Sequence, residues 1–412
     1  MESTAKLAIH GESTWCTTGV PASPDREVYG MVRAMINGAC RYYLGSKPCK
    51  FNKLDGSECP TCTHVSVFRS RVLIIKLDAL GDVLRTASLL PAITARHDSP
   101  YICWLTRPEA VQLVKMMQGV DEVAALNVDG LARIASGNWD YVYALSNDYS
   151  TASLAMMAAP RHPPIGYSVR DGVLHPSNAA AARWLELAAF DRLKRANTEP
   201  YQKIMLGIIG ENAEFGPPRL EVDDRLLEGA RERVSRLFGT SNRRRVAINI
   251  GAGGRWPKKM LDARQISEYA AAASSRLDVD VVLVGGPAEA SKAQAILELC
   301  GPNSPVRTAL TADSLPEFVA VLSQADVLLC GDTLALHVAT AIQLPTVCVI
   351  GPTSNAELAD FGGLVAKTSV SGLDCLGCYG DCQKAQNCMS LFEIEQLVDL
   401  TANQLSRAPV MS

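Results

Sequence analysis

The chain has 412 residues, more than the roughly 250–300 at which a single hydrophobic core stops growing, so its length predicts at least two domains. Hydrophobic residues make up 48% and charged residues 20%, which excludes a disordered or fibrous protein. With 40 Lys+Arg against 43 Asp+Glu, the net charge of −3 excludes nucleic acid as a partner attracted by an overall basic field.

Residues 1–20 lack the basic segment and apolar run of a signal peptide, and no later run of 18 residues predicts a membrane span. We therefore expect a cytoplasmic protein. In such a chain, 13 cysteines indicate reduced thiols or metal ligands rather than disulfides. Four of them stand singly in apolar sequence and are expected in the core: Cys103, Cys300, Cys330 and Cys348.

Residues 1–69 show little strand periodicity and predict a tail followed by a small cysteine-rich extension. Four cysteines gather in this extension, beside His64, with a loose spacing that could close around one metal ion. They are Cys40, Cys49, Cys59 and Cys62.

The β-branched run at residues 72–75 predicts a strand buried on both faces, and a helix is expected over residues 83–96. Similar units follow, so the sequence predicts a domain built on a parallel sheet. The units pair strand 101–105 with helix 109–118 and strand 141–145 with helix 151–159, and a short strand 123–126 lies between them.

Residues 176–214 read as helical, and Phe215-Gly-Pro-Pro218 is the strongest internal break. We place the domain boundary there, with one domain over 70–215 and a second over 216–412. The second domain repeats the pattern with strands at 246–250, 281–284, 327–329 and 346–350 and helices from 262 and 287. The expected fold class is therefore α/β: two doubly wound Rossmann-like domains that face a cleft across their strand ends.

The segment that follows strand 327–329 predicts an anion site. Gly331 permits a tight turn, and Asp332-Thr333 stands where a helix N-cap belongs, so free backbone N–H groups would point into the cleft. His337, one turn further, could reach a phosphate. The alternative is that Asp332 only caps the helix and His337 only packs.

The loop at residues 251–259 is rich in glycine and carries three basic side chains, Arg255, Lys258 and Lys259, one of which would meet the anion. Trp256 stands in place of the third glycine of G-x-G-x-x-G, so this is not a Rossmann fingerprint. A basic solvated turn is the alternative. Glu289, after the next strand, could accept from ribose hydroxyls or could simply be solvated.

Asp82 follows a glycine at the start of a helix in the first domain. A carboxylate there, across the cleft from the anion site, could take the proton of an acceptor hydroxyl. Helix capping is the alternative interpretation. Glycosyl transfer needs a base for the acceptor hydroxyl and a site that stabilises the leaving diphosphate. Here each domain would supply one of the two.

Five ordered segments, within about residues 71–405, together resemble the heptosyltransferase family of glycosyltransferases. They are Leu80-Gly-Asp-Val83, Asn249-Ile-Gly-Ala252, Leu283-Val-Gly-Gly-Pro-Ala-Glu289, Cys330-Gly-Asp-Thr333 with His337, and Gly351-Pro-Thr353. The resemblance implies a GT-B fold and an inverting mechanism without a divalent ion. It also implies ADP-L-glycero-D-manno-heptose or a related donor.

By the same resemblance Asp82 matches the family's general base and Glu289 its nucleoside-side acid. Gly254 stands where the family usually has its diphosphate-binding lysine, so the charge must come from a neighbouring basic residue, for which we choose Lys258. The donor-binding residues expected beside Lys258 are Gly251, Ala252, Arg255, Lys259, Glu289, Gly331, Asp332, Thr333, His337, Gly351, Pro352 and Thr353.

The N-terminal cysteine extension is not part of the family's common pattern, so the acceptor stays open. A glycan, a protein and a small molecule all fit. The sequence also leaves open whether the acceptor brings the chain to a membrane surface and whether the chain forms oligomers.

A second cysteine cluster has tighter spacing, with glycines that supply turns around one tetrahedral metal ion: Cys375, Cys378, Cys382 and Cys388. Autotransporter heptosyltransferases, a branch of the same family, carry a four-cysteine iron site toward the C-terminus, whereas plain relatives often hold cysteines there without metal. No cofactor is expected for catalysis. Structural iron or zinc in either cluster is the open alternative, and spacing does not separate the two metals.

Two other functions remain alternatives. A sugar-nucleotide epimerase of the same architecture would need acid and base residues on both faces of the sugar. Only Asp82 and His337 are candidates for these roles. A non-catalytic protein could instead bind nucleotide and recruit a partner through its cysteines.

Overall fold

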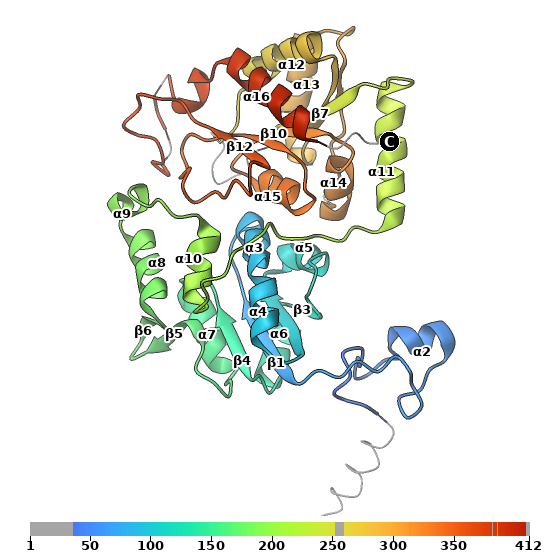
Figure 1. The fold of residues 1–412 in the computed structure, drawn as a ribbon, viewed down its shortest axis with the longest axis vertical. Helices are drawn as coiled ribbons and strands as arrows, with labels where there is room; N and C mark the ends of the chain where they lie inside the picture. Colours follow the sequence, from blue (N-terminus) through green and yellow to red (C-terminus); the bar gives the residue numbers. More distant parts are fainter. Residues whose placement is uncertain (1–35, 252–258, 313, 381, 385, 409–412) are drawn as a thin grey trace, which may run out of the picture. The chain divides into compact units, whose positions relative to one another are not determined.

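The computed structural model describes residues 36–251, 259–312, 314–380, 382–384 and 386–408 (Figure 1). The chain divides into two compact units, Met1–Phe68 and Arg69–Ser412. In the small unit, helix α2 (Lys50–Asp55) and an antiparallel bridge between Cys40 and Val67 are the regular elements among the residues described. Within this unit the His64 ring stacks on Phe51 at 4.0 Å, and its Nε2 lies 3.0 Å from Asp55.

The first half of the large unit, residues 69–215, is built on a six-stranded sheet in the order β3-β2-β1-β4-β5-β6. Its central strands are buried on both faces, as their apolar sequence predicts. β5 and β6 are antiparallel, and the other pairs are parallel. The strands are β1 (Ser70–Ile75), β2 (Pro100–Thr106), β3 (Glu122–Ala125), β4 (Tyr141–Ala144), β5 (Ile165–Arg170) and β6 (Val173–Pro176).

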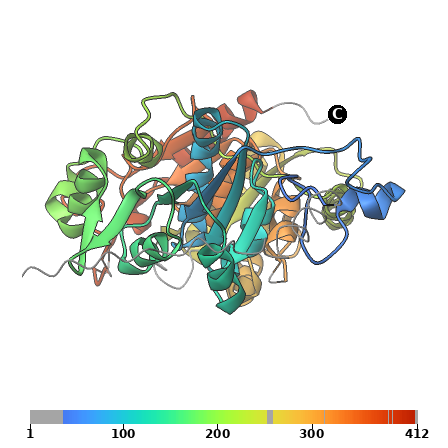
Figure 2. The ribbon, with the colours of Figure 1, turned by 90° about the horizontal axis from the view of Figure 1, so that it is seen from below.

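The expected continuous helix over residues 83–96 is wrong. The chain forms α3 (Leu80–Thr86), a 3₁₀ turn η1 (Ala87–Leu89) and then α4 (Leu90–Arg96). Pro91 explains the break, because it lacks an N–H and fits only the first turn of a helix. Helices lie on both faces of the sheet (Figure 2).

The other helices of this half are η2 (Pro108–Ala110), α5 (Val111–Lys115), α6 (Val128–Ala135), α7 (Tyr149–Met157), α8 (Ala179–Ala189), α9 (Asp191–Arg195) and α10 (Tyr201–Ile208). The last three occupy the stretch 176–214 that the sequence predicts to be helical.

The second half, residues 216–408, holds another six-stranded sheet, all parallel, in the order β12-β11-β10-β7-β8-β9. Its strands are β7 (Arg244–Asn249), β8 (Val279–Val284), β9 (Val306–Thr308), β10 (Val327–Gly331), β11 (Thr346–Val349) and β12 (Val365–Thr368). Its helices are α11 (Asp224–Phe238), α12 (Ala263–Leu277), η4 (Pro287–Glu289), α13 (Ala290–Cys300), α14 (Leu315–Leu322), α15 (Leu334–Ala341), η5 (Cys388–Leu391) and α16 (Ile394–Arg407).

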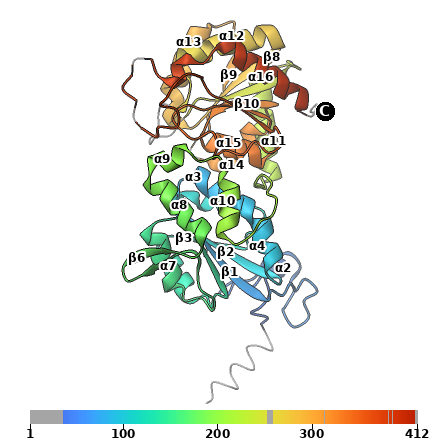
Figure 3. The same cartoon turned by 60° about the vertical axis from the view of Figure 1, so that its left-hand side comes forward.

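The two halves meet where α3 contacts α15 (Figure 3). One apolar cluster continues from the first half into the second, with Leu84 and Leu336 among its buried members. The predicted α/β fold of two Rossmann-like sheets is thus confirmed. Among the described residues, no helix has both the length and the apolar character to cross a bilayer.

Candidate active site

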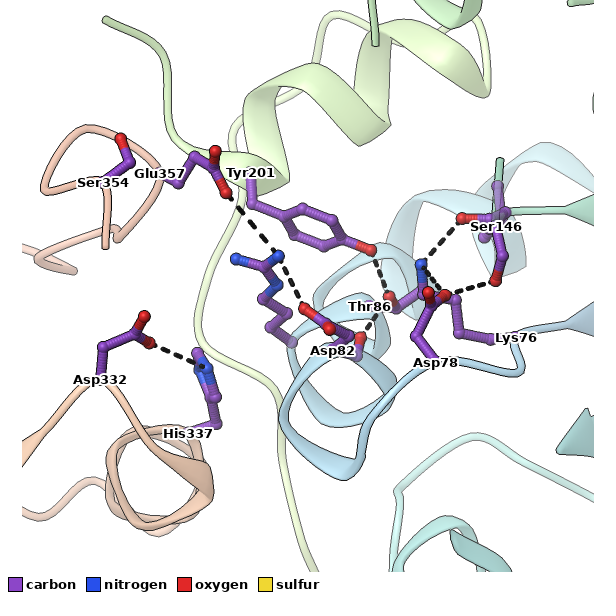
Figure 4. A network of polar contacts seen from close by, with 12 residues as sticks. Lys76, Asp78, Asp82, Thr86, Ser146, Tyr201, Asp332, His337, Ser354 and Glu357 are labelled. Atoms are coloured by element: carbon purple, nitrogen blue, oxygen red, sulfur yellow. Dashed lines mark hydrogen bonds and ion pairs between the residues drawn. The ribbon is translucent and has the colours of Figure 1, made fainter. Parts of the chain in front are cut away.

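Asp82 lies in the first turn of α3, but it does not cap the helix. The N-cap is Ala79, which makes no side-chain cap, so the capping interpretation of Asp82 is wrong. The Asp82 carboxylate instead lies 2.7 Å from the guanidinium of Arg85 and keeps about a third of its surface exposed, at 36% (Figure 4). This carboxylate is therefore held by an ion pair and remains accessible.

The electrostatic environment keeps Asp82 ionised. Burial acts to raise its pKa, but the charges of Arg85 and Lys76, with a contribution from His337, outweigh burial and hold the pKa below its ordinary value. At neutral pH the group is therefore a carboxylate that can accept a hydrogen bond from a hydroxyl.

Arg85 is a side chain that the sequence analysis did not single out. Its guanidinium lies 3.7 Å from the centroid of the Tyr201 ring, and it is 3.9 Å from the carboxylate of Glu357 in the second half. The side chain is only 13% exposed. Arg85 therefore lies between a carboxylate of each half.

Tyr201 and Glu357 are two further site residues that the sequence patterns did not indicate. The backbone N–H of Tyr201 donates to the carbonyl of Glu357 at 3.0 Å, and the Tyr201 hydroxyl lies 2.6 Å from that of Thr86 (Figure 4). Tyr201 thus connects α10, α3 and the loop after β11. No local sequence pattern predicts the contacts of Tyr201 with Thr86 and Glu357, because the three residues come from distant segments of the chain.

The loop between β1 and α3 is held by a buried lysine. Lys76 donates to the carbonyl of Leu145 at 2.8 Å and lies 2.8 Å from the carboxylate of Asp78, which also accepts from the Ser146 hydroxyl. Burial acts to raise the pKa of Asp78, and Lys76 more than offsets it. Asp78 is therefore committed to a structural ion pair.

In the second half, Thr333 is the N-cap of α15, and Asp332 precedes it. The ammonium of Lys259 lies 3.4 Å from a carboxylate oxygen of Asp332 and donates to its carbonyl at 3.3 Å. Gly331 is required at this turn, because a Cβ there would lie 1.9 Å from the carbonyl oxygen of Lys259.

His337 faces both halves. Its Nε2 is 3.9 Å from Asp332, and a Cβ built on Gly81 would lie 2.8 Å from its Cδ2. Burial, aided by the charge of Arg85, lowers the pKa of His337 to about 4. The imidazole is thus neutral at pH 7 and could meet a phosphate as a hydrogen-bond donor rather than as a cation.

Three of the predicted donor-binding residues converge at the ends of β7, β8 and β10. A Cβ on Gly251 would lie 2.9 Å from the carboxyl carbon of Glu289, and Asn249 donates both to the Gly251 carbonyl at 2.7 Å and to the Thr333 hydroxyl at 3.2 Å. Glu289 also accepts from the N–H of Gly286 at 2.9 Å. The predicted residues Ala252, Arg255 and Lys258 lie outside the described residues.

The predicted loop of Gly351, Pro352 and Thr353 borders a cavity of about 400 Å³ whose lining includes Gly351 and Thr353. The cysteine loop packs on it, since Gly377 donates to the carbonyl of Gly351 at 3.1 Å and Tyr379 donates to that of Pro352 at 2.8 Å. A Cβ at Gly351 would lie 2.5 Å from the Cys388 sulfur.

The other thiols of the C-terminal cluster act on Cys388. Burial raises the pKa of Cys388, and the other three thiols, Cys378, Cys375 and Cys382, add to the increase. Such a donor set suits a thiophilic metal. Among the described residues, however, no three His, Cys, Asp or Glu side chains are arranged to hold a metal ion, in this cluster or in that of the small unit, so this arrangement does not support the metal assignment, which stays a prediction.

Within the described ranges the cysteines form no disulfide with one another: Cys40, Cys49, Cys59, Cys62, Cys103, Cys300, Cys330, Cys348, Cys375, Cys378, Cys382 and Cys388. Of the four predicted in the core, three are buried and Cys300 is half-buried.

Similar folds occur in solved glycosyltransferases. A Veillonella parvula glycosyl transferase of family 9 is 18% identical, with a TM-score of 0.63, over 83% of this chain and 98% of that one. ADP-heptose LPS heptosyltransferase II of E. coli is 15% identical, with a TM-score of 0.61, over 82% of this chain and 99% of that one. At these identities the likeness concerns the fold.

A curated relative from Haemophilus influenzae is described only as a glycosyltransferase. It is 25% identical over an alignment of 183 residues that covers 41% of this chain. The match spans about half of that relative, 51% of its length.

Two α/β domains on mainly parallel sheets form a GT-B-like fold, as in the E. coli heptosyltransferase II. The pattern of glycosyltransferase family 9 (heptosyltransferase) matches residues 131–388, more than half of the chain. The protein belongs to this family.

Proposed function

We propose that this protein is an inverting glycosyltransferase that moves a heptose, or a related sugar, from an ADP-sugar to an acceptor hydroxyl. The observation that carries the proposal is the approach of Gly81 to His337, which brings Asp82 of the first half next to Asp332 and the start of α15 in the second. The named activity of the E. coli relative supports the choice of donor.

Asp82 is the general base of this proposal. The acceptor oxygen attacks the anomeric carbon, its proton passes to the Asp82 carboxylate, and the bond from that carbon to the ADP oxygen breaks, with inversion at the carbon. The ion pair with Arg85 orients the carboxylate and keeps it ionised. Arg85 is thus a positioning residue.

The diphosphate is held by the N-terminus of α15, where the N–H groups of the first helical residues after Thr333 precede the first intrahelical hydrogen bonds. The ammonium of Lys259 already pairs with Asp332, which favours Lys258 as the cation that meets the departing ADP. Glu289 takes the ribose side, and the remaining donor contacts belong to Gly251, Ala252, Arg255, Gly331, His337, Gly351, Pro352 and Thr353.

The reaction in this scheme needs no divalent ion, because a cationic side chain and a helix N-terminus stabilise the leaving group. Iron or zinc in a cysteine cluster would be structural. Thiolates would be the ligands, and metal binding would be coupled to folding of the loop.

Incubation with radiolabelled ADP-heptose and a host lysate, followed by mass spectrometry of the products, tests the proposal. Transfer of the heptose to an acceptor with release of ADP supports it. Recovery of an epimerised sugar nucleotide would instead identify an epimerase. Tight binding of ADP without turnover under any acceptor condition would leave a nucleotide-binding protein.

A further inference from the structure

Lys292, in the first turn of α13, is a half-buried lysine that the proposed mechanism does not use. Its ammonium donates to the carbonyl of Ile250 at 3.2 Å and to that of Leu261 at 2.9 Å. Ile250 directly precedes the predicted donor-binding loop 251–259, and Leu261 follows shortly after it. One side chain thus joins the two ends of this loop.

The two carbonyl groups belong to buried residues, since Ile250 is 1% exposed and Leu261 is fully buried. A buried carbonyl that loses its hydrogen bond costs free energy, so both groups need a partner. Burial lowers the pKa of the Lys292 ammonium, and the carboxylates of Asp262 and Glu289 offset only part of this effect. The lysine is therefore placed where an ammonium is costly, and its two hydrogen bonds are what it contributes there.

The first end of the loop contacts the proposed anion site through Asn249. This side chain donates to the carbonyl of Gly251 at 2.7 Å and to the hydroxyl of Thr333, the N-cap of α15, at 3.2 Å. A Cβ on Gly251 would also lie 2.9 Å from the carboxyl carbon of Glu289, one turn before Lys292. A displacement of the chain at this end would therefore move Gly251 relative to both Thr333 and Glu289.

The second end contacts the same turn through Lys259. Its ammonium lies 3.4 Å from the carboxylate of Asp332, and its carbonyl oxygen would lie 1.9 Å from a Cβ on Gly331. Both contacts are with the turn between β10 and α15. Because Lys259 stands just before Leu261, the hydrogen bond from Lys292 fixes the chain close to these contacts.

We propose that Lys292 is a positioning residue for donor binding, which holds Ile250 and Leu261 so that both ends of the loop stay against the turn before α15. The proposal rests on the proposed glycosyl transfer and concerns its ADP-binding step. Lys292 does not itself contact ADP. It preorganises the site, because a loop whose ends are already fixed loses less conformational freedom when ADP binds.

Calorimetric titration of the full chain with ADP tests this role. Lys292→Met removes both hydrogen bonds and keeps an apolar stem, and it should weaken ADP about tenfold, or about 1.4 kcal/mol. Lys292→Arg keeps N–H donors on a long stem and should recover most of the loss.

Arg307→Met is the matched control. Arg307 is also a half-buried cation of the second half, and it donates to two carbonyls away from the loop, those of Ser304 at 2.7 Å and Val306 at 2.8 Å. Lys292→Met and Arg307→Met should both lower the melting temperature, whereas only Lys292→Met should weaken ADP.

The proposal is overturned if Lys292→Met binds ADP like the parent, if Arg307→Met weakens ADP as much, or if Lys292→Arg recovers none of the affinity. If Lys292→Met does not fold, Lys292→Gln, which keeps one amide group, carries the same expectation and the same refutation. A parent chain that does not bind ADP would refute the proposed function instead.

Discussion

The carboxylate of Asp82 lies 2.7 Å from the guanidinium of Arg85, one turn along the same helix. Arg85 in turn lies within reach of Glu357 in the second half, at 3.9 Å. The proposed base is thus oriented by a cation that also approaches a carboxylate of the second half.

Replacement of the base is the first prediction. Asp82→Asn should lower turnover about 10²–10⁴-fold, the usual contribution of a positioned general base, while ADP affinity stays unchanged. The ion pair with Arg85 is lost, so a fall of a few degrees in melting temperature is expected. Asp129→Asn, an exposed acid in the first turn of α6, is the matched control and should be silent. Near-native turnover of Asp82→Asn with a verified acceptor would remove Asp82 from the mechanism.

The second prediction concerns the pH dependence of turnover. Because the charge of Arg85 lowers the pKa of Asp82, Arg85→Gln should raise that pKa and move the acidic limb of the kcat profile to higher pH. Arg85→Lys keeps the charge and should restore part of the shift. A profile that only falls in height, with its acidic limb in place, would mean that Arg85 acts on packing alone.

His337 makes the third prediction, for stability. Its pKa is about 4 in the folded protein against 6.5 for a free histidine, so the unfolded chain binds a proton that the folded chain does not between these values. Stability should therefore fall as pH drops from about 6.5 to about 4, by up to about 3 kcal/mol. Urea denaturation of the parent and of His337→Gln over this range measures the difference. If the free energy of unfolding changes equally with pH in the parent and in His337→Gln, the low pKa of His337 is refuted.

The fourth prediction identifies the cation. Lys258→Ala should weaken ADP binding and turnover together, because its charge meets the diphosphate before and during departure. Arg255→Ala and Lys259→Ala are the comparison variants. If only one of them weakens ADP binding and turnover, that residue is the cation that meets the diphosphate. If all three variants bind ADP like the parent, the loop is a solvated turn.

Metal content gives the fifth prediction. Purified protein should contain about one tightly held transition metal per occupied cysteine cluster, and chelation should lower the melting temperature because site assembly is coupled to folding. Turnover should survive partial metal loss. The metal assignment is refuted if elemental analysis finds no transition metal and all 13 thiols titrate after denaturation.

The strands that support the site could be predicted from sequence because each is a short, continuous apolar run. β1, β7 and β10 all lie where their β-branched and leucine residues place them. Asp82 lies in the first turn of α3 and Asp332 directly after β10, and their roles stay predictions.

The antiparallel pair β5 and β6 was missed although a local signal existed. Asp171 and Gly172 both have positive φ, 50° and 77°, which is the backbone of the tight turn that Asp-Gly favours. By contrast, no local signal could have found the contacts among Arg85, Tyr201 and Glu357. They depend on tertiary packing of segments more than a hundred residues apart in the chain.

The contact between Gly81 and His337 limits how the two halves can move. A hydrogen is all that separates the backbone of α3 from the imidazole, since a methyl group at residue 81 would lie 2.8 Å from Cδ2. At this point the halves have no remaining distance to close. For the proposed transfer, we therefore expect substrates to enter by rotation of the halves about this contact or by their separation.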